Sequence, residues 1–500
     1  MAERRDRGTQ EPTVLDDARI DAIITQVMSE LHEAERGPHE PLPPVGPAAP
    51  ARPAPELPHP DNLFPDVDGA VQAARRAFEQ LGGLPLALRE RMISHMRRTA
   101  RENAQVLARL ACDETGMGRL EDKIEKNLLN ANKVPGPEIL APTAWTGDDG
   151  MALVEYAPYG VIGAITPSTN PTSSVICNAI GMVAAGNAVV FNAHPGAKAC
   201  TNLAVQLLHQ AIVEAGGPAN LVCATADPTI ESAQEIMRHP AVNLLTVTGG
   251  EGVVKAAMQS GKRAICAGPG NPPVVVDETA DVDQAGRGVV RGASFDNNIV
   301  CIVEKETFVV ATVADALKRS MQAHGGYEID AGQLDRLMKV IFTKVPPPGE
   351  AGMMNKGFIG KSAAVLLKEI GITVGDEVRL IMAEVGADHP LVVTEQMMPI
   401  MPLVRIRHAD EGIDLAKKVE HGYRHTAVMY SKNLDHLSRM ARVMDCSIFV
   451  KNAPSLAGLG AGGEGFCSFT IASPTGEGLT NPISFSRIRR CTLKDAFRIV

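Results

Sequence analysis

One cysteine, one asparagine and one glutamate lie in segments that could carry chemistry. Cys301 ends the segment 294–301, Asn170 lies in the turn 165–171, and Glu395 lies in a later loop. A thiolate can add to a carbonyl carbon and form a covalent thioester. The oxyanion of that addition needs donors already in place, and the Asn170 amide and the Cys301 backbone N–H could supply them. Each residue also has an ordinary explanation, as a buried thiol, a turn-forming asparagine and an exposed loop acid.

The composition is that of an ordinary globular chain. Its 500 residues exceed one compact core, so two or three packed units are expected. The net charge of −9 and the lack of a basic stripe argue against nucleic acid as a partner. No apolar run is long enough to cross a bilayer, and no secretory signal is recognisable. The nine cysteines occur singly, without zinc spacing, which favours a reducing cytoplasmic compartment and no metal.

The first sixty residues are expected to be separate from the rest. Residues 1–36 contain a capping box at Thr13 and Asp16, followed by apolar residues on one helical face: Ile20, Ile23, Ile24, Val27 and Leu31. Residues 37–60 are rich in proline, which predicts a semi-extended linker. A tethered amphipathic helix is typical of docking into a partner's groove, and packing on its own domain or a sister subunit is the alternative.

From about residue 61, short apolar strands alternate with helices. A helical periodicity runs from Val71 to Leu110, and a second alternating series begins after Asp277. The clearest predicted strands are 161–165, 188–191, 221–224, 244–247, 264–267, 273–276 and 307–310. This alternation predicts two doubly wound α/β units whose mostly parallel sheets are covered on both faces. Ligands bind such sheets beyond the carboxyl ends of the strands, where the turns named above fall.

The order of these segments resembles the aldehyde dehydrogenase superfamily over nearly all of the chain beyond residue 62. In that family an asparagine helps form the oxyanion hole, a Thr-Gly turn lies on the dinucleotide side, and the nucleophilic cysteine follows. A glutamate before a proline then holds the nicotinamide ribose. Asn170, Gly249, Cys301 and Glu395 match these positions in this order.

The resemblance implies a domain order and a set of site residues. It implies a dinucleotide-binding domain at 61–273 with a subunit-bridging β segment near 142–159, a catalytic domain at 274–465, and a C-terminal oligomerisation segment at 466–500. Cys301 and Asn170 would be catalytic and His425 a substrate-pocket candidate. The implied cofactor-binding residues are Thr166, Pro167, Ser168, His194, Gly249, Gly250, Gly268 and Glu395. The implied cofactor is NAD, but His194 replaces a lysine that many family members use at the adenosine ribose, which leaves the choice between NAD and NADP open.

Several blocks are similar to the CoA-acylating propionaldehyde and acetaldehyde dehydrogenases of bacterial microcompartments. These blocks are 295–298, 425–427, 459–465, 468–470, 476–478 and 485–491. The similarity implies a short aldehyde and CoA as substrates, with NAD as cofactor. It also implies a homo-dimer or homo-tetramer inside a bacterial microcompartment, with the N-terminal helix bound to shell or core proteins.

The fate of the thioester decides between CoA and water as acceptor. Hydrolytic members of the family activate water with a glutamate before a Gly-Gly-Lys-type turn, and aligning that turn with 268–272 places Cys266 there. A thiol is a poor base for water, whereas CoA brings its own thiol. A hydrolytic enzyme with its base elsewhere, for example His425, is one alternative. A non-catalytic scaffold that kept the fold is another.

Overall fold

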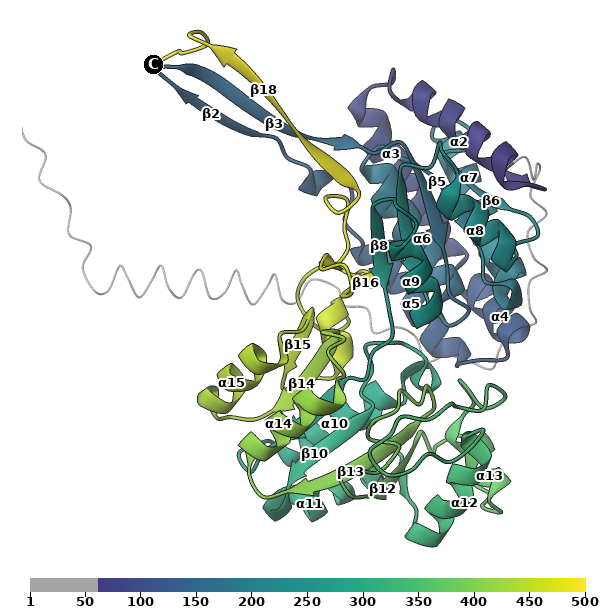
Figure 1. The fold of residues 1–500 in the computed structure, drawn as a ribbon, viewed down its shortest axis with the longest axis vertical. Helices are drawn as coiled ribbons and strands as arrows, with labels where there is room; N and C mark the ends of the chain where they lie inside the picture. The colour runs from purple at the N-terminus through teal and green to yellow at the C-terminus, as the bar shows by residue number, and fades with distance from the viewer. Residues whose placement is uncertain (1–61) are drawn as a thin grey trace, which may run out of the picture. The chain divides into compact units, whose positions relative to one another are not determined.

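Buried apolar segments form the strands of a first parallel sheet. The computed structural model of the chain describes residues 62–500, so the helix predicted at 1–36 and the linker predicted at 37–60 lie outside the described residues. The sheet has the order β1-β6-β5-β4-β7-β8 (Figure 1). Its strands are β1 (Leu63–Phe64), β4 (Val161–Ile165), β5 (Ala188–Asn192), β6 (Val222–Thr225), β7 (Leu244–Thr248) and β8 (Ala264–Ala267).

Two groups of helices pack on this sheet. Helices α2 and α8 contact each other and β4, while α6 and α7 contact each other and lie against β5 and β6, backed by α3. Burial on both faces explains why these strands are continuously apolar. The helices of this half are α2 (Val67–Leu81), α3 (Leu86–Glu102), α4 (Ala104–Thr115), α5 (Leu120–Lys133), α6 (Pro171–Ala184), α7 (Lys198–Glu214), α8 (Ile230–Arg238) and α9 (Glu251–Met258).

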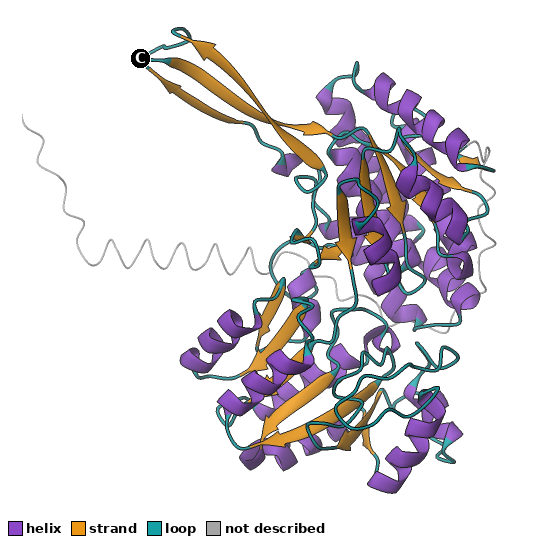
Figure 2. Ribbon diagram, viewed as in Figure 1, coloured by secondary structure: helices purple, strands orange, loops and turns teal. Residues whose placement is uncertain are grey.

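A second parallel sheet follows in the order β11-β12-β13-β10-β9-β14-β15. Figure 2 shows helices around the strands of both sheets. The strands are β9 (Pro273–Val276), β10 (Glu306–Val310), β11 (Gly326–Glu328), β12 (Leu380–Glu384), β13 (Ile400–Ile406), β14 (Thr426–Tyr430) and β15 (Ile448–Lys451). The helices are α10 (Val282–Ala293), α11 (Ala311–Ala323), α12 (Ala331–Ile341), α13 (Ala363–Glu369), α14 (Ala409–Val419) and α15 (Leu434–Met444). The α/β fold class with parallel sheets is therefore confirmed.

The periodicity between Val71 and Leu110 belongs to three helices. Gly82 caps the end of α2, Pro85 precedes α3, and Asn103 separates α3 from α4. Proline disfavours a helical conformation at the residue before it, which explains the break that the periodicity alone does not show. Among the described residues, no helix is long and apolar enough to span a membrane.

A third sheet is antiparallel and largely exposed. Strand β3 (Gly150–Pro158) pairs with β2 (Thr143–Gly147) and with β18 (Ser486–Lys494) (Figure 1). The guanidinium of Arg490 lies 5.8 Å from the ring centre of Trp145. The β segment predicted near 142–159 is thus a hairpin, and the C-terminal segment adds a third strand that the sequence did not indicate. The assignment of this sheet to oligomerisation stays a prediction, as do the predicted domain borders.

Candidate active site

Cys301 follows a loop with an unusual backbone. Asp296, Asn297 and Asn298 have φ values of +47°, +53° and +68°, in the left-handed region. This region is unfavourable for residues with a side chain, although Asn and Asp tolerate it better than most. Three successive residues keep such a conformation only where the surrounding structure fixes it.

Hydrogen bonds that the loop donates to other segments, and that it accepts from Lys305, fix this backbone conformation. The Asn297 amide donates to the carbonyl oxygens of Gly118, at 3.2 Å, and Gly360, at 2.8 Å. The buried ammonium of Lys305 donates to the backbone oxygen of Asn298 at 2.8 Å and to its side-chain oxygen at 2.6 Å. The position of Cys301 is therefore set by contacts with several distant segments.

Cys301 is a half-buried residue whose thiol, in the chain alone, is protonated at neutral pH. Burial raises the pKa of this thiol to about 12, and the carboxylate of Glu395 acts in the same direction. The charges of Lys305 and Lys126 oppose this rise in pKa only in part. Catalysis requires the thiolate form of Cys301, and therefore a lowered thiol pKa. The chain's own groups do the reverse, so a cation bound beside the sulfur would have to supply the lowering.

Gly270 brings three of the predicted residues together. Its N–H donates to Glu395 Oε1 at 3.4 Å. A Cβ atom at Gly270 would lie 2.7 Å from the Cys301 carbonyl oxygen and 3.0 Å from Cγ of the His425 ring. Glu395 and His425 therefore lie beside the cysteine, and only a glycine fits between them.

His425 is a poor candidate for a base that activates water. Its side chain is buried, and burial together with the charge of Lys305 lowers its pKa to about 4. The ring atom Nδ1 lies 2.9 Å from Thr426 Oγ1, and Nε2 has no hydrogen-bond partner among the described residues. A base with so low a pKa drives proton abstraction from water only weakly.

Cys266 is equally unsuited to that task. It lies in β8 with no exposed surface, and burial raises its thiol pKa to about 11. Its backbone N–H donates to Thr475 Oγ1 at 3.0 Å. The position that aligns with the water-activating glutamate thus holds a buried, protonated thiol.

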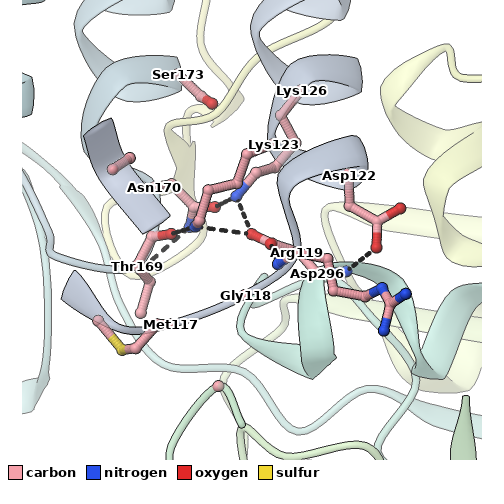
Figure 3. Close-up of polar contacts among 12 residues, drawn as sticks. Met117, Gly118, Arg119, Asp122, Lys123, Lys126, Thr169, Asn170, Ser173 and Asp296 are labelled. Atoms are coloured by element: carbon pink, nitrogen blue, oxygen red, sulfur yellow. Dashed lines mark hydrogen bonds and ion pairs between the residues drawn. The ribbon is translucent and has the colours of Figure 1, made fainter. Parts of the chain in front are cut away.

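Asn170 lies between β4 and α6, and its side chain points toward α5 (Figure 3). It occupies the N-cap position before Pro171, yet its side chain makes no capping hydrogen bond. Its Oδ1 accepts from Lys126 Nζ at 2.7 Å, and its Nδ2 donates to Thr169 Oγ1 at 3.1 Å. The ordinary explanation of Asn170 as a helix-capping or turn residue therefore does not account for its side chain.

The predicted cofactor residues other than Glu395, which lies between β12 and β13 of the second sheet, follow neighbouring strands of the first sheet. Residues 166–168 follow β4, His194 follows β5, residues 249–250 follow β7 and Gly268 follows β8, and these strands are adjacent in the order β5-β4-β7-β8. His194 is exposed, and its Nδ1 accepts from Gly196 N–H at 3.1 Å. Gly268 is buried against Pro474. The fold therefore gathers at one sheet edge residues that are far apart in the sequence.

This edge has features that fit a dinucleotide. Buried hydroxyls of Thr166 and Thr248, after β4 and at the end of β7, lack hydrogen-bond partners within the described part of the chain. Gly250 precedes α9 without a side-chain cap, and the space where its Cβ would lie is open. Free N–H groups at a helix N-terminus favour phosphate. Unpartnered hydroxyls and an open helix end together suit a phosphorylated ligand.

A buried charged cluster beside Asn170 escaped the sequence analysis. Lys123 and Lys126 on α5 both pair with Asp296, and these three side chains are almost completely buried. In α5 the buried face is polar and the apolar residues Ile124, Leu128 and Leu129 are only half-buried. Hydrophobic periodicity would have placed the opposite face inside. The available signal was the pair of lysines three residues apart in a helix with a poor apolar face.

Comparison with known proteins agrees with this fold. Residues 60–332 match the aldehyde dehydrogenase family, and the chain belongs to that family. It is 48% identical over 443 residues to the acetylating acetaldehyde dehydrogenase EutE of Salmonella typhimurium, covering 88% of this chain and 94% of that protein.

Two solved structures share the fold. The propionaldehyde dehydrogenase of Rhodopseudomonas palustris, with bound CoA and an acylated cysteine, gives a TM-score of 0.84 at 46% identity, covering 87% of this chain and 98% of that one. The propionaldehyde dehydrogenase of the Clostridium phytofermentans fucose utilisation bacterial microcompartment gives a TM-score of 0.85 at 46% identity. The match covers 88% of this chain and all of the Clostridium chain.

Proposed function

We propose that the chain is a CoA-acylating aldehyde dehydrogenase, which converts a short aldehyde, NAD and CoA to acyl-CoA and NADH through a thioester on Cys301. The observation that carries the proposal is that Cys301 lies beside Glu395 and His425 at Gly270, while Cys266, at the aligned position of the water-activating carboxylate, is a buried thiol. The names of the relatives support it, since one is acetylating and another was solved with CoA and an acylated cysteine.

The chain's residues perform the addition step. The Cys301 thiolate attacks the aldehyde carbon, a C–S bond forms, and the carbonyl π electrons move to oxygen as an oxyanion. The Asn170 amide and the Cys301 backbone N–H stabilise this oxyanion as it forms. The two sides of the site come from different sheets, which the loop at Gly270 connects.

The cofactor is held by the edge of the first sheet. NAD, when bound, supplies the hydride acceptor and a cationic ring near the thiol. Glu395 would hold the ribose through its half-buried carboxyl group, and the N-terminus of α9 with the hydroxyls of Thr166 and Thr248 would hold the phosphates. The exposed His194 after β5 leaves both NAD and NADP as candidates.

CoA removes the acyl group from Cys301. The CoA thiolate attacks the thioester carbon, a new C–S bond forms, and Cys301 leaves as a thiolate that is ready for the next aldehyde. No base for water is needed, because the thiol of CoA is far more acidic than water and its thiolate is a good nucleophile. Neither Cys266 nor His425 therefore has to accept a proton from water.

CoA dependence tests this proposal. We expect sustained NADH formation from propionaldehyde or acetaldehyde only with CoA, and a single-turnover burst at most without it. Absorbance of NADH and chromatography of the products measure both outcomes. An equal steady rate without CoA, with free acid as product, would show that water is the acceptor.

We further propose that residues 1–36 carry the enzyme into a bacterial microcompartment. A volatile, reactive aldehyde gives a physical reason for enclosure, and one structural relative comes from such a compartment. Removal of residues 1–36 is expected to leave kcat/KM unchanged and to abolish co-purification with shell proteins. Ile24→Glu, on the predicted apolar face, should have the same effect, whereas Ser29→Glu, off that face, should not. Packaging that survives the deletion contradicts the targeting role.

The antiparallel sheet of β2, β3 and β18 suits a subunit contact in a homo-dimer or homo-tetramer. Nearly all side chains of β2 and β18 are exposed in the single chain, including Trp145 and Ile488, and those of β3 are mostly half-buried. The strands β2 and β18 form the two edges of this sheet. Exposed edges of this kind are normally covered by another chain or element.

A further inference from the structure

We propose that Lys126 is a positioning residue that holds the Asn170 amide and the loop preceding Cys301 in one arrangement. The inference rests on the proposed function, because it assigns Lys126 a part in stabilising the oxyanion. Lys126 does not touch the reacting atoms. It acts through Asn170.

Lys126 connects two segments that are otherwise far apart in the sequence. Its side chain is 1% exposed, and its ammonium donates to Asn170 Oδ1 at 2.7 Å. The same ammonium forms an ion pair with the fully buried carboxylate of Asp296, in the left-handed loop before Cys301 (Figure 3). One group on α5 thus contacts the oxyanion donor and the loop of the nucleophile.

The other end of this bridge is itself held in place. Asp296 Oδ1 accepts the backbone N–H of Arg119 at 2.7 Å, and the Asp296 backbone N–H donates to Asp122 Oδ2 at 2.8 Å. Both bonds join the loop to the first turn of α5 or the residue before it. Asp296 is therefore a fixed anchor, and Lys126 transmits its position to Asn170.

The contact also selects the orientation of the Asn170 amide. An ammonium group can only donate hydrogen bonds, so the amide must turn its oxygen toward Lys126 and its NH₂ group away. One N–H donates to Thr169 Oγ1, and the second has no partner among the described residues. Donation to the amide oxygen also polarises the amide and strengthens its N–H groups as donors. A ready donor is what an oxyanion requires.

The charge balance of the cluster favours an anion nearby. Lys123 and Lys126 face Asp296, and Asp122 is further out, paired with Arg291 and Arg379. Burial lowers the pKa of Lys126 to about 8, against the opposing effect of Asp296, so its charge is kept at neutral pH. Lys123 and Lys126 share the carboxylate of Asp296, while the buried Asp122 is neutralised by its two arginines, so positive potential remains beside Asn170.

Lys123 offers a matched control. It lies one helical turn from Lys126, is equally buried, and pairs with the same Asp296 oxygen at 3.2 Å. Its ammonium is 3.5 Å from the Thr169 backbone oxygen and makes no described contact with the Asn170 side chain. Loss of Lys123 removes a buried charge from the cluster but leaves the amide of Asn170 held.

The experiment compares two reactions of the same thiol without NAD or CoA. Acylation by p-nitrophenyl acetate forms the Cys301–acyl bond and expels p-nitrophenolate through an oxyanion, whereas alkylation by iodoacetamide forms no oxyanion. Dividing the acylation rate by the alkylation rate removes the effect of any change in the thiolate fraction of Cys301 or in its accessibility. We measure it for the full-length wild type, Lys126→Met, Asn170→Ala, the double variant and Lys123→Met, with Cys301→Ala as the blank.

Lys126→Met is expected to lower the ratio about tenfold, less than complete loss of an oxyanion donor. In the Asn170→Ala background, Lys126→Met should lower the ratio hardly any further, because Lys126 acts through the Asn170 amide, which is then missing. Lys123→Met should leave the ratio near that of wild type. If Lys126→Met does not fold, Lys126→Gln replaces it in the double-mutant cycle with Asn170→Ala. Lys126→Gln should lower the ratio less than Lys126→Met, and should not lower it in the Asn170→Ala background.

Two results would overturn the inference while the proposed function stands. One is an independent, multiplicative effect of Lys126→Met and Asn170→Ala. The other is an equal loss in Lys123→Met, which would show that the cluster acts only by its charge or its packing. An unchanged ratio in Asn170→Ala would instead overturn the oxyanion role of Asn170 itself, and with it the route assigned to Lys126.

Discussion

Replacement of Cys301 by alanine is expected to lower CoA-dependent NADH formation by about 10⁴-fold or more, as loss of a covalent nucleophile does in other enzymes. The reason is that the acyl bond forms on the Cys301 sulfur, and the neighbouring Glu395 and His425 are weaker nucleophiles toward a carbonyl carbon. Glu395 is a carboxylate next to the backbone of Gly270, and His425 is buried with an unpartnered Nε2. Steady-state rates with propionaldehyde, NAD and CoA measure the effect, and the thermal unfolding temperature confirms that the variant is folded.

Cys266→Ala provides the matched control for that experiment. This thiol belongs to β8 of the first sheet, has no exposed surface, and has its pKa raised by burial to about 11. The variant should keep its activity and lose a little stability, because a small buried group is removed. Activity that survives in Cys301→Ala, or is lost in Cys266→Ala, would show that Cys301 is not the nucleophile. The partly exposed Cys112 and Cys446 and the exposed Cys491 would then be tested in turn.

The parts of the fold that sequence predicts well are those with local signals. Strand 161–165 was predicted at its observed bounds, and strand 188–191 is one residue shorter than β5. Runs of buried apolar residues are hard to place anywhere but inside a sheet covered on both faces. Cys301, Glu395 and His425 could be proposed for the site because each stands in a recognisable block, and the structure brings them together around Gly270.

What the sequence could not show depends on contacts between distant segments. The ion pairs of Asp296 join residues about 170 positions apart, and no local pattern marks α5 as a helix with a polar buried face. The same limit applies to the thiol pKa of Cys301, which burial and Glu395 raise. Strand β18 is another case, because an exposed strand lacks the apolar alternation that predicts one.

Replacement of Asn170 by alanine is expected to slow acylation of Cys301 by about 10²- to 10³-fold, the usual effect of removing one oxyanion donor. The side chain is nearly buried, makes no helix cap, and is held by Lys126, so its function lies in what its NH₂ group can reach. The pre-steady-state burst of NADH measures the first half-reaction directly. Alkylation of Cys301 by iodoacetamide should be little changed, since no oxyanion forms in that reaction.

Asn178→Ala is the control for this variant, because Asn178 is a second buried asparagine on α6. Its Oδ1 accepts from the Thr470 hydroxyl at 2.8 Å, and its removal leaves that hydroxyl without this acceptor. A buried polar group that loses its partner costs about 1–3 kcal/mol of stability. We therefore expect a lower unfolding temperature for Asn178→Ala with a normal burst. Equal losses of burst rate in both variants would mean that α6 supports the site only by its packing, and Asn170 would lose its catalytic assignment.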